Sequence, residues 1–329
     1  MNWKKKKVLV TGAGGFIGSH LTEGLVRLGA DVKAFIRYNS RSDEGNIKLL
    51  PNDIRNKIHI YRGEIRELET IREAIKGIDI VFNLAALIGI PYSYEHPQEV
   101  IETNVIGTLN VLIAARDEKV ERLIQTSTSE VYGSALYTPI DEKHPLQPQS
   151  PYSASKISSD AISLSFYYSF GLPVSIIRPF NAYGPRQSAR AVIPTIIMQI
   201  LTRDKVLLGS IKPKRDLTYV LDTVEGFIKT AESQKAIGEV MNIGSGEDIS
   251  IGELTKKIMM IMGKDVKVQV DKKRVRPINS EVKRLCADNS RAAKILGWKP
   301  KVSLDNGLSR TIEYIKSHLD YYKPDEYIV

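Results

Sequence analysis

A tyrosine and a lysine four residues apart, Tyr152 and Lys156, form the pair in this sequence best suited to acid–base chemistry. In a helix this spacing puts both side chains on one face, so both can reach one substrate hydroxyl. A tyrosine with a pKa of about 10 is a poor base at neutral pH, and a nearby ammonium group favours its phenolate. The pair is therefore a candidate proton-transfer site, although the same spacing also occurs on ordinary solvated helix faces.

A second group of chemically informative residues is the glycine-rich segment TGAGGFIGS at residues 11–19. It joins an expected strand at residues 7–11 to an expected helix at residues 16–28. Glycine allows a tight turn and a close approach of the backbone to a pyrophosphate, which then lies at the helix N-terminus. The segment predicts a dinucleotide site. The cofactor-binding residues expected within it are Gly12, Gly15, Phe16, Ile17 and Gly18.

The second expected strand, at residues 32–36, ends in Arg37 and lacks the acid that would accept hydrogen bonds from an adenosine ribose. Tyr38, Asn39 and Ser40 follow it. A cation and hydroxyl groups at this position fit a ribose 2′-phosphate. We therefore predict NADP rather than NAD, the alternative being that Arg37 stacks on the adenine or faces solvent.

Apolar runs and helical periods alternate through the first half of the chain, and these elements must position the candidate residues. Further strands are expected at residues 58–61, 80–83, 122–126 and 174–178, and helices at 67–76, 98–116 and 152–170. This succession predicts an α/β fold with a doubly wound parallel sheet of the Rossmann kind, covered by helices on both faces.

Prolines interrupt this pattern after Arg178, and we expect two domains. Residues 1–180 would form the dinucleotide-binding domain and residues 181–329 a smaller C-terminal α/β lobe. A helix at 221–232 and a strand at 240–243 are candidates to return to the first domain. Further helices are expected at 251–262, 290–296 and 304–318, with a strand at 266–270.

Composition excludes several classes of protein. With 42% hydrophobic and 26% charged residues, the 329-residue chain can bury a large core. Its single cysteine, Cys286, rules out an internal disulfide and multi-cysteine metal sites; no metal is expected, and the inventory fits a cytoplasmic enzyme. The net charge of +9 comes from scattered lysines without a nucleic-acid-binding motif, so anionic small molecules are the expected partners. The longest apolar run, at 78–92, is too short and too polar for a membrane span.

Several motifs together resemble the extended short-chain dehydrogenase/reductase family, over essentially the whole chain. They are TGAGGFIGS, NLAA at 83–86, TSTSEVYG at 126–133, YSASK at 152–156, RPFNAYGPRQ at 178–187, Arg215-Asp216 and NSRAAKILGWKP at 289–300. The resemblance implies that the N-terminal domain binds NAD or NADP and the C-terminal lobe binds a nucleotide-activated sugar. It adds to the expected cofactor site Glu64, Ile65, Leu84, Ala85, Ala86, Asn104, Tyr152 and Lys156.

The triplet Thr128, Ser129 and Glu130 is informative about the reaction. Simple 4-epimerases of this family usually lack the glutamate, and many dehydratases carry Thr-Asp-Glu; GDP-mannose 4,6-dehydratases have serine at the second position, as this chain does. Eliminating water requires one group to remove a proton beside a ketone and another to protonate the leaving hydroxyl. The resemblance implies that Tyr152 deprotonates the sugar 4-hydroxyl while Thr128 hydrogen-bonds it. Glu130 would then remove the C5 proton, and Ser129 or Glu130 would protonate the leaving 6-hydroxyl.

The stretch at 178–197, with FIRYNSR at 35–41 and residues 242–245, is most similar to bacterial 4,6-dehydratases of nucleotide-linked N-acetylglucosamine in nonulosonic acid synthesis. Three alternatives stay open. UDP-glucuronate decarboxylases share Thr-Ser-Glu, related enzymes end C4 oxidation in C5 or C4 epimerisation, and cofactor-sensing regulators share the fold but typically lose the tyrosine or lysine. The sequence does not distinguish UDP, GDP and TDP.

Phosphate recognition in the C-terminal lobe is expected from arginines, because a guanidinium presents a planar fork of donors. The residues chosen by motif position are Asn181, Arg186, Arg190, Arg215 and Arg276.

We also expect a homodimer formed by the helices at 98–116 and 152–170. Their apolar residues provide more apolar surface than one sheet face needs. These residues are Val105, Leu109, Leu112 and Ile113 together with Ile162, Leu164, Phe166 and Tyr167.

Overall fold

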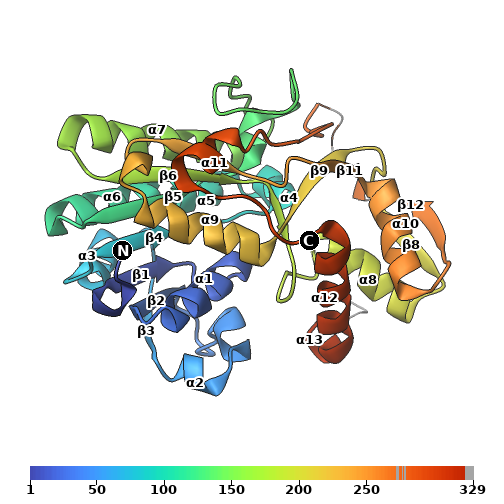
Figure 1. Cartoon of the computed structure of the whole chain (residues 1–329), viewed down its shortest axis with the longest axis horizontal. Coiled ribbons are helices and arrows are strands. Elements are labelled where there is room, and N and C mark those ends of the chain that lie inside the picture. Colours follow the sequence, from blue (N-terminus) through green and yellow to red (C-terminus); the bar gives the residue numbers. More distant parts are fainter. Residues whose placement is uncertain (272–273, 276, 278, 323–329) are drawn as a thin grey trace.

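A seven-stranded parallel sheet forms the larger part of the protein, in a computed structural model that describes residues 1–271, 274–275, 277 and 279–322. Its strand order is β10-β6-β5-β4-β1-β2-β3. The predicted doubly wound α/β fold is therefore confirmed (Figure 1). The strands are β1 (Lys7–Thr11), β2 (Asp31–Arg37), β3 (Ile58–Gly63), β4 (Ile80–Asn83), β5 (Arg122–Thr126), β6 (Val174–Pro179) and β10 (Val240–Ile243).

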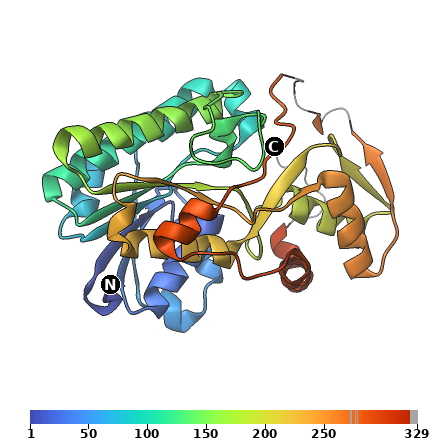
Figure 2. The ribbon, with the colours of Figure 1, turned by 45° about the horizontal axis from the view of Figure 1, so that its top comes forward.

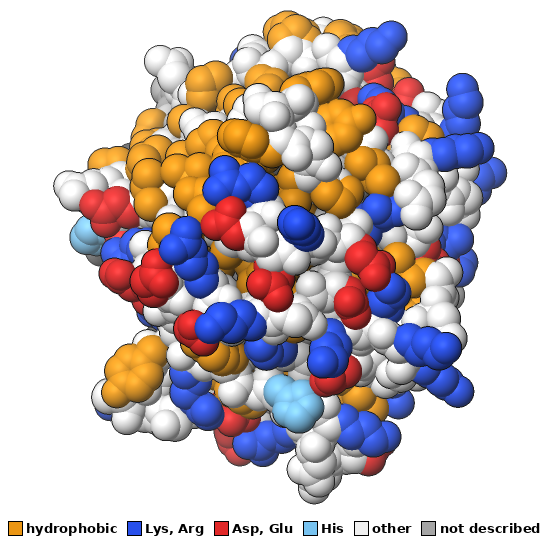
Figure 3. All heavy atoms as spheres, turned by 90° about the vertical axis from the view of Figure 1, so that its left-hand side faces the viewer, with side chains coloured by type: hydrophobic (Ala, Val, Ile, Leu, Met, Phe, Trp, Pro, Cys, Tyr) orange, Lys and Arg blue, Asp and Glu red, His pale blue; other side chains and the backbone are white. Residues whose placement is uncertain are grey.

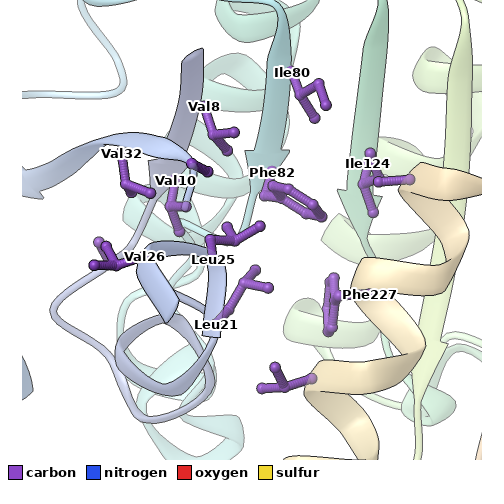
Figure 4. Packing of buried hydrophobic residues seen from close by; sticks show 14 of the residues in the cluster. Val8, Val10, Leu21, Leu25, Val26, Val32, Ile80, Phe82, Ile124 and Phe227 are labelled. Carbon is purple, nitrogen blue, oxygen red and sulfur yellow. The ribbon is translucent and has the colours of Figure 1, made fainter. Parts of the chain in front are cut away.

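Helices cover both faces of this sheet, and each face has its own apolar core. On one face, α1 (Phe16–Arg27) and α9 (Val220–Glu232) pack together, and their Leu21, Leu25 and Phe227 meet Phe82 of β4 (Figure 4). On the other face lie α3 (Leu68–Ile75), α6 (Gly107–Glu118) and α7 (Pro151–Phe170). Burial on both faces explains why the central strands β4 and β6 are buried along their whole length, whereas the edge strand β3 is partly exposed.

The helix expected at residues 98–116 is divided into three parts. It begins as α5 (Pro97–Ile101), passes through a π-helical turn, η3 (Glu102–Ile106), and continues as α6. Such turns are rare and occur frequently at functional sites. This one places Asn104 against α7, with consequences described below.

The helix α7 has clear start and stop signals. Ser150 and Ser153 form a capping box around its first turn, and Pro151 occupies a position where its missing N–H costs nothing. Gly171 ends the helix in the left-handed conformation, with φ 66°. Tyr152 and Lys156 therefore lie within the first two turns of a well-defined helix.

The second lobe lies beside the large sheet (Figure 2) and contains two small sheets. The first has the order β11-β9-β7, and the second pairs β12 with β8 in parallel. Its elements are β7 (Asn181–Tyr183), α8 (Val192–Thr202), β8 (Lys205–Leu208), β9 (Lys214–Tyr219), β11 (Asp248–Ser250), α10 (Ile251–Met262), β12 (Lys267–Val270), α12 (Leu304–Ser317) and α13 (Leu319–Tyr322).

Three elements that alternate in sequence with those of the second lobe pack on the large sheet instead. The strand β10 pairs with β6, and α9 packs on α1 and on β5 and β6. The helix α11 (Ser290–Leu296) packs against β10 and α9. The remaining short elements are η1 (Trp3–Lys5), η2 (Gly45–Leu49), α2 (Asn52–Arg55), α4 (Ile90–Glu95), η4 (Ser129–Tyr132) and η5 (Gln234–Ala236). Among the described residues, no helix combines the length and apolarity needed to cross a membrane.

Candidate active site

A cavity of about 750 Å³ extends along the carboxyl ends of the central strands. The strand order reverses between β1 and β4, which is where ligands bind in open α/β sheets. The segments that follow the strands supply most of its lining. They fall within residues 12–18, 35–45, 63–66, 84–90, 126–130 and 179–191, and Thr103 and Tyr152 also line it.

The glycine-rich turn fits a dinucleotide pyrophosphate. Gly12 has φ +67°, and a Cβ atom on Gly18 would lie 2.2 Å from the Gly12 carbonyl oxygen, so only glycine allows this approach of turn and helix. Gly15 begins α1 without a side-chain cap, which leaves the helix N-terminus available to an anion. The residues predicted here as cofactor contacts, Gly12, Gly15, Phe16, Ile17 and Gly18, all line the cavity.

The loop after β4 is held at the cavity by a buried threonine at the end of β1. The Thr11 hydroxyl donates to Asn83 Oδ1 at 2.6 Å and accepts from the backbone N–H groups of Leu84 (3.0 Å) and Ala85 (3.1 Å). Asn83 Nδ2 donates to Gln125 Oε1 on β5 at 2.8 Å. This network aligns three neighbouring strands and positions the predicted residues Leu84, Ala85 and Ala86, which line the cavity.

Asn104, predicted as a cofactor contact, is buried and does not belong to the cavity lining. Its Oδ1 accepts from Leu87 N at 2.8 Å, and its Nδ2 donates to Leu87 O and to Ser155 Oγ, both at 2.9 Å. The side chain therefore fastens the loop after β4 to the first turns of α7. Its place in the structure is that of a positioning residue.

The predicted catalytic residues converge on one end of the cavity. Tyr152, Thr128 and Glu130 line it. Burial raises the pKa of Tyr152, the charge of Glu130 raises it further, and a hydrogen bond with Thr128 opposes both. Ser129 is buried and lies outside the cavity lining, which distinguishes it from its two neighbours.

Lys156 is buried beside Tyr152 on the same face of α7. Burial lowers its pKa to about 8, while the carboxylate of Asp160 opposes this shift. Most Lys156 side chains therefore carry a proton at neutral pH. The charge of Asp160 also raises the pKa of Tyr152.

The residues predicted to contact the adenosine part of the cofactor also line the cavity. Glu64 and Ile65 follow β3, and Arg37 ends β2. Although burial opposes its charged form, hydrogen bonds from Arg66 lower the pKa of Glu64. Arg37 also lines an adjoining pocket of about 270 Å³ together with Arg190, Tyr92 and Glu99. Arg190, predicted to bind substrate, thus lines the same pocket as Arg37, which was predicted to bind the cofactor.

Two predicted phosphate ligands have protein partners instead. Arg186 is buried against α1, where Nη2 lies 2.8 Å from Glu23 Oε2 and Nε donates to His20 Nε2 at 3.3 Å. Arg215 is also buried, and its Nη1 donates to the backbone oxygens of Lys214 (3.0 Å) and Val282 (2.8 Å). Neither residue belongs to the cavity lining. Arg276 lies outside the described residues.

The substrate end of the cavity has polar atoms that sequence reasoning missed. Thr126 and Gln187 line it with the predicted Asn181. Within the described part of the chain, Thr126 Oγ1, Asn181 Oδ1 and Gln187 Oε1 are buried and have no hydrogen-bond partner. Buried polar atoms normally have partners, so these three indicate where a polar ligand binds. The position of Gln187 within RPFNAYGPRQ was the available signal.

Comparison with known proteins agrees with this geometry. A family model described as GDP-mannose 4,6 dehydratase matches residues 9–311. The chain belongs to this family. A UDP-N-acetyl-alpha-D-glucosaminuronate decarboxylase of Bacillus cytotoxicus is 35% identical over 329 residues, covering 95% of this chain and 98% of that protein. A dTDP-D-glucose 4,6-dehydratase of Mus musculus is 31% identical over 330 residues, covering 98% of this chain and 92% of that protein.

A solved structure extends the comparison to three dimensions. The UDP-glucuronic acid 4-epimerase of Bacillus cereus, in complex with UDP-glucuronic acid and NAD, has a TM-score of 0.85 and 31% identity. The match covers 95% of this chain and 99% of that structure. This member of the GDP-mannose 4,6-dehydratase family is therefore an enzyme of the nucleotide-sugar dehydratase and epimerase kind, and the cofactor-sensing alternative is rejected.

Proposed function

We propose that this enzyme is a nucleotide-sugar 4,6-dehydratase that recycles its nicotinamide cofactor within each turnover. The observation that carries the proposal is Glu130, which lies in the cavity close enough to Tyr152 for its charge to raise the tyrosine pKa. Elimination needs an acid–base group beside the hydride-transfer centre.

A bound nicotinamide supplies reversible acceptance of hydride from sugar C4. The protein residues handle protons: Tyr152 takes the proton of the 4-hydroxyl and Thr128 hydrogen-bonds that oxygen. Glu130 removes the C5 proton made acidic by the 4-ketone. Because Glu130 lines the cavity and Ser129 does not, Glu130 is also the better candidate to protonate the leaving 6-hydroxyl.

The proposed substrate is a nucleotide-activated N-acetylhexosamine. Sequence similarity of the stretch at 178–197 supports an amino sugar. The Bacillus cytotoxicus relative, by its name, acts on a UDP-linked N-acetylated sugar acid. The unpartnered Asn181 and Gln187 oxygens are suited to accept hydrogen bonds from hydroxyl or amide N–H groups of such a ligand.

Mass spectrometry of products after incubation with a panel of nucleotide sugars tests the reaction. Dehydration gives a product lighter by one water, with deuterium at C5 in heavy water and the original C4 hydrogen at C6. Loss of carbon dioxide from a uronate would identify a decarboxylase instead. A product of unchanged mass and inverted configuration would identify C4 oxidation with epimerisation.

We propose NADP as the preferred cofactor. The support is the pocket of about 270 Å³ that adjoins the main cavity, which Arg37 and Arg190 line together with Glu99, since two guanidinium groups suit a ribose 2′-phosphate. The Bacillus cereus epimerase structure contains NAD, so a titration of the apoprotein with both oxidised cofactors is needed. Tighter binding of NAD would reject the preference.

We also propose a homodimer through α6 and α7. Leu109, Ile113, Ile162 and Leu164 are only partly buried, whereas Leu112 and Phe166 belong to the core of one subunit. Figure 3 shows hydrophobic side chains gathered over the upper part of the face that it draws. Near the C-terminus of α7, Tyr168 and Phe170 are exposed. Sedimentation that gives a monomer at micromolar concentration would reject the dimer.

A further inference from the structure

A third charged residue continues the face of α7 that carries Tyr152 and Lys156. Asp160 follows Lys156 by four residues, so the three side chains lie on successive turns of one helix face. The Asp160 side chain is 3% exposed, and it pairs with Arg178 on β6, whose side chain is 5% exposed. A buried ion pair thus lies next to the proposed proton-transfer pair.

The contacts of Asp160 are concentrated on one oxygen. Arg178 Nε (3.1 Å), Arg178 Nη2 (3.0 Å) and the Ser127 hydroxyl (2.8 Å) all donate to Oδ2. Oδ1 is buried and has no hydrogen-bond partner among the described residues. Three donors therefore anchor the carboxylate, while one oxygen keeps its capacity to stabilise a further positive charge.

Contacts with Tyr132 hold the Arg178 side chain in place, so the ion pair with Asp160 cannot easily rearrange. Its Nη1 donates to the Tyr132 hydroxyl at 2.9 Å, and its guanidinium carbon lies 5.0 Å from the centre of the Tyr132 ring. The Tyr132 hydroxyl donates in turn to Asn242 Oδ1 at 2.7 Å. A simple structural ion pair would balance one cation with one carboxylate. Here two buried cations, Arg178 and Lys156, share the carboxylate of Asp160.

Other charged groups near α7 are engaged elsewhere or act on other atoms. Among the described residues, Asp160 is the group whose charge raises the pKa of Lys156, and the charges of Glu130 and Asp160 both raise the pKa of Tyr152. Glu99 accepts from Tyr92, and Glu102 accepts from Gln98 and pairs with Arg66. The titratable residues on the elements packed against α7 are Tyr92, Tyr94, Glu95, Glu99, Glu102, Arg116, Asp117, Glu118, Glu130, Tyr132 and Arg178, and α7 itself adds Tyr152, Asp160, Tyr167 and Tyr168.

We propose that Asp160, oriented by Arg178 and Ser127, is a positioning residue whose carboxylate is the counter-charge of the Lys156 ammonium. The proposal rests on the proposed function, in which Tyr152 takes the proton of the 4-hydroxyl, and on the capacity of a Lys156 ammonium to favour the phenolate of Tyr152. It assigns to Asp160 an effect on the reaction that passes through Lys156, without contact with substrate. Removing the negative charge should take away the anion that opposes the burial of the Lys156 ammonium and so favour the neutral form of Lys156.

The test follows the titration of Lys156 in the full-length protein. With lysine labelled by ¹³C at Cε, the Lys156 signal is assigned by its loss in Lys156→Met and followed by NMR as pH changes. Asp160→Asn is expected to lower the pKa of Lys156 by ~1 unit or more, as expected when an opposite charge nearby is removed. Asp160→Glu keeps the carboxylate and should restore the pKa.

A double variant covers the case in which Asp160→Asn alone does not fold. Asp160→Asn leaves the buried Arg178 uncompensated, whereas Asp160→Asn combined with Arg178→Met removes both charges of the pair. The charge of Asp160 rather than that of Arg178 acts on the pKa of Lys156, so the double variant should still titrate below the wild type. An unchanged Lys156 pKa in a folded single or double variant overturns the proposal.

The pH dependence of enzyme activity distinguishes a failure of this inference from a failure of the proposed function. If the Lys156 ammonium is required, activity falls as pH rises through a pKa of about 8, and Asp160→Asn moves this fall to lower pH. If the NMR titration shifts and the alkaline limit of activity does not, the counter-charge is upheld and the reaction role of Lys156 is rejected. A purely structural Asp160 would lower activity equally at every pH and leave the NMR titration in place.

Discussion

The substitution Thr11→Val tests whether the buried hydroxyl at the end of β1 holds the cofactor loop. Valine has nearly the same shape, so the change removes hydrogen bonds without opening a large cavity. It deprives the N–H groups of Leu84 and Ala85 of their acceptor and Asn83 Oδ1 of its donor. A buried polar group left without a partner costs about 1–3 kcal/mol.

The lower end of this range applies, because Leu84 and Ala85 line the cavity and water can reach them. Three such groups give a loss of about 3 kcal/mol in the free energy of unfolding. A chain of this length has an unfolding entropy near 0.7 kcal/mol per kelvin, so the melting temperature should fall by about 4 °C. The affinity for oxidised cofactor should fall as well, because the loop forms one wall of its site.

Thr22→Val in α1 is the matched control. Thr22 is as fully buried as Thr11, but its hydroxyl has no hydrogen-bond partner among the described residues. Removing that hydroxyl should be neutral or stabilising by up to ~1 kcal/mol. Thermal unfolding and cofactor titration of both variants provide the comparison. Equal effects of Thr11→Val and Thr22→Val would refute the reasoning, since they would show that the hydrogen-bond network carries no stability.

Three further predictions concern the reaction, the cofactor and the pH dependence of stability. In single turnover, Glu130→Gln should bind cofactor and accumulate its reduced form by absorbance, whereas Tyr152→Phe should block that first oxidation; equal behaviour would contradict the assigned roles. Arg37→Ala should weaken NADP binding more than NAD binding by calorimetry, and a larger loss of NAD affinity would contradict the 2′-phosphate assignment. Burial, and then the charge of Arg186, lower the pKa of His20 from 6.5 to about 3. As the pH falls, the histidine is therefore protonated in the unfolded chain before it is protonated in the folded protein. The free energy of unfolding should fall as pH drops from 6.5 toward 3. His20→Gln should flatten this part of the urea-unfolding profile, and an unchanged slope would show that other groups cause it.

Local patterns in the sequence were sufficient for the large sheet. Its seven strands are apolar runs bounded by turn residues, and the expected ranges differ from the observed ones by at most two residues at either end. The glycine turn and the spacing of Tyr152 and Lys156 are also local properties, because dihedral preference and helix periodicity act within a few residues. Such features can be predicted without knowing the tertiary structure.

The helices α10, α11 and α12 and the strand β12 were also predicted, but the other strands of the second lobe and the π-helical turn were not predictable in this way. The strands β7, β8, β9 and β11 have three to six residues each, too few to show a period, and they exist because they pair with distant segments. The turn at Glu102–Ile106 lies in an otherwise helical pattern. Its Asn104 contacts with Leu87 and Ser155 come from two other parts of the chain.

The partner that each arginine side chain contacts depended on tertiary structure alone. The sequence supplied Arg178, Arg186, Arg190 and Arg215 without indicating their partners. Folding pairs Arg178 with Asp160, turns Arg186 toward α1 and brings Arg190 beside Arg37. A guanidinium on a long, flexible side chain can reach many acceptors, and its choice follows from which groups are buried with it. Residue type and spacing therefore determined the chemistry available to this enzyme, whereas packing decided which charges meet substrate and which neutralise one another.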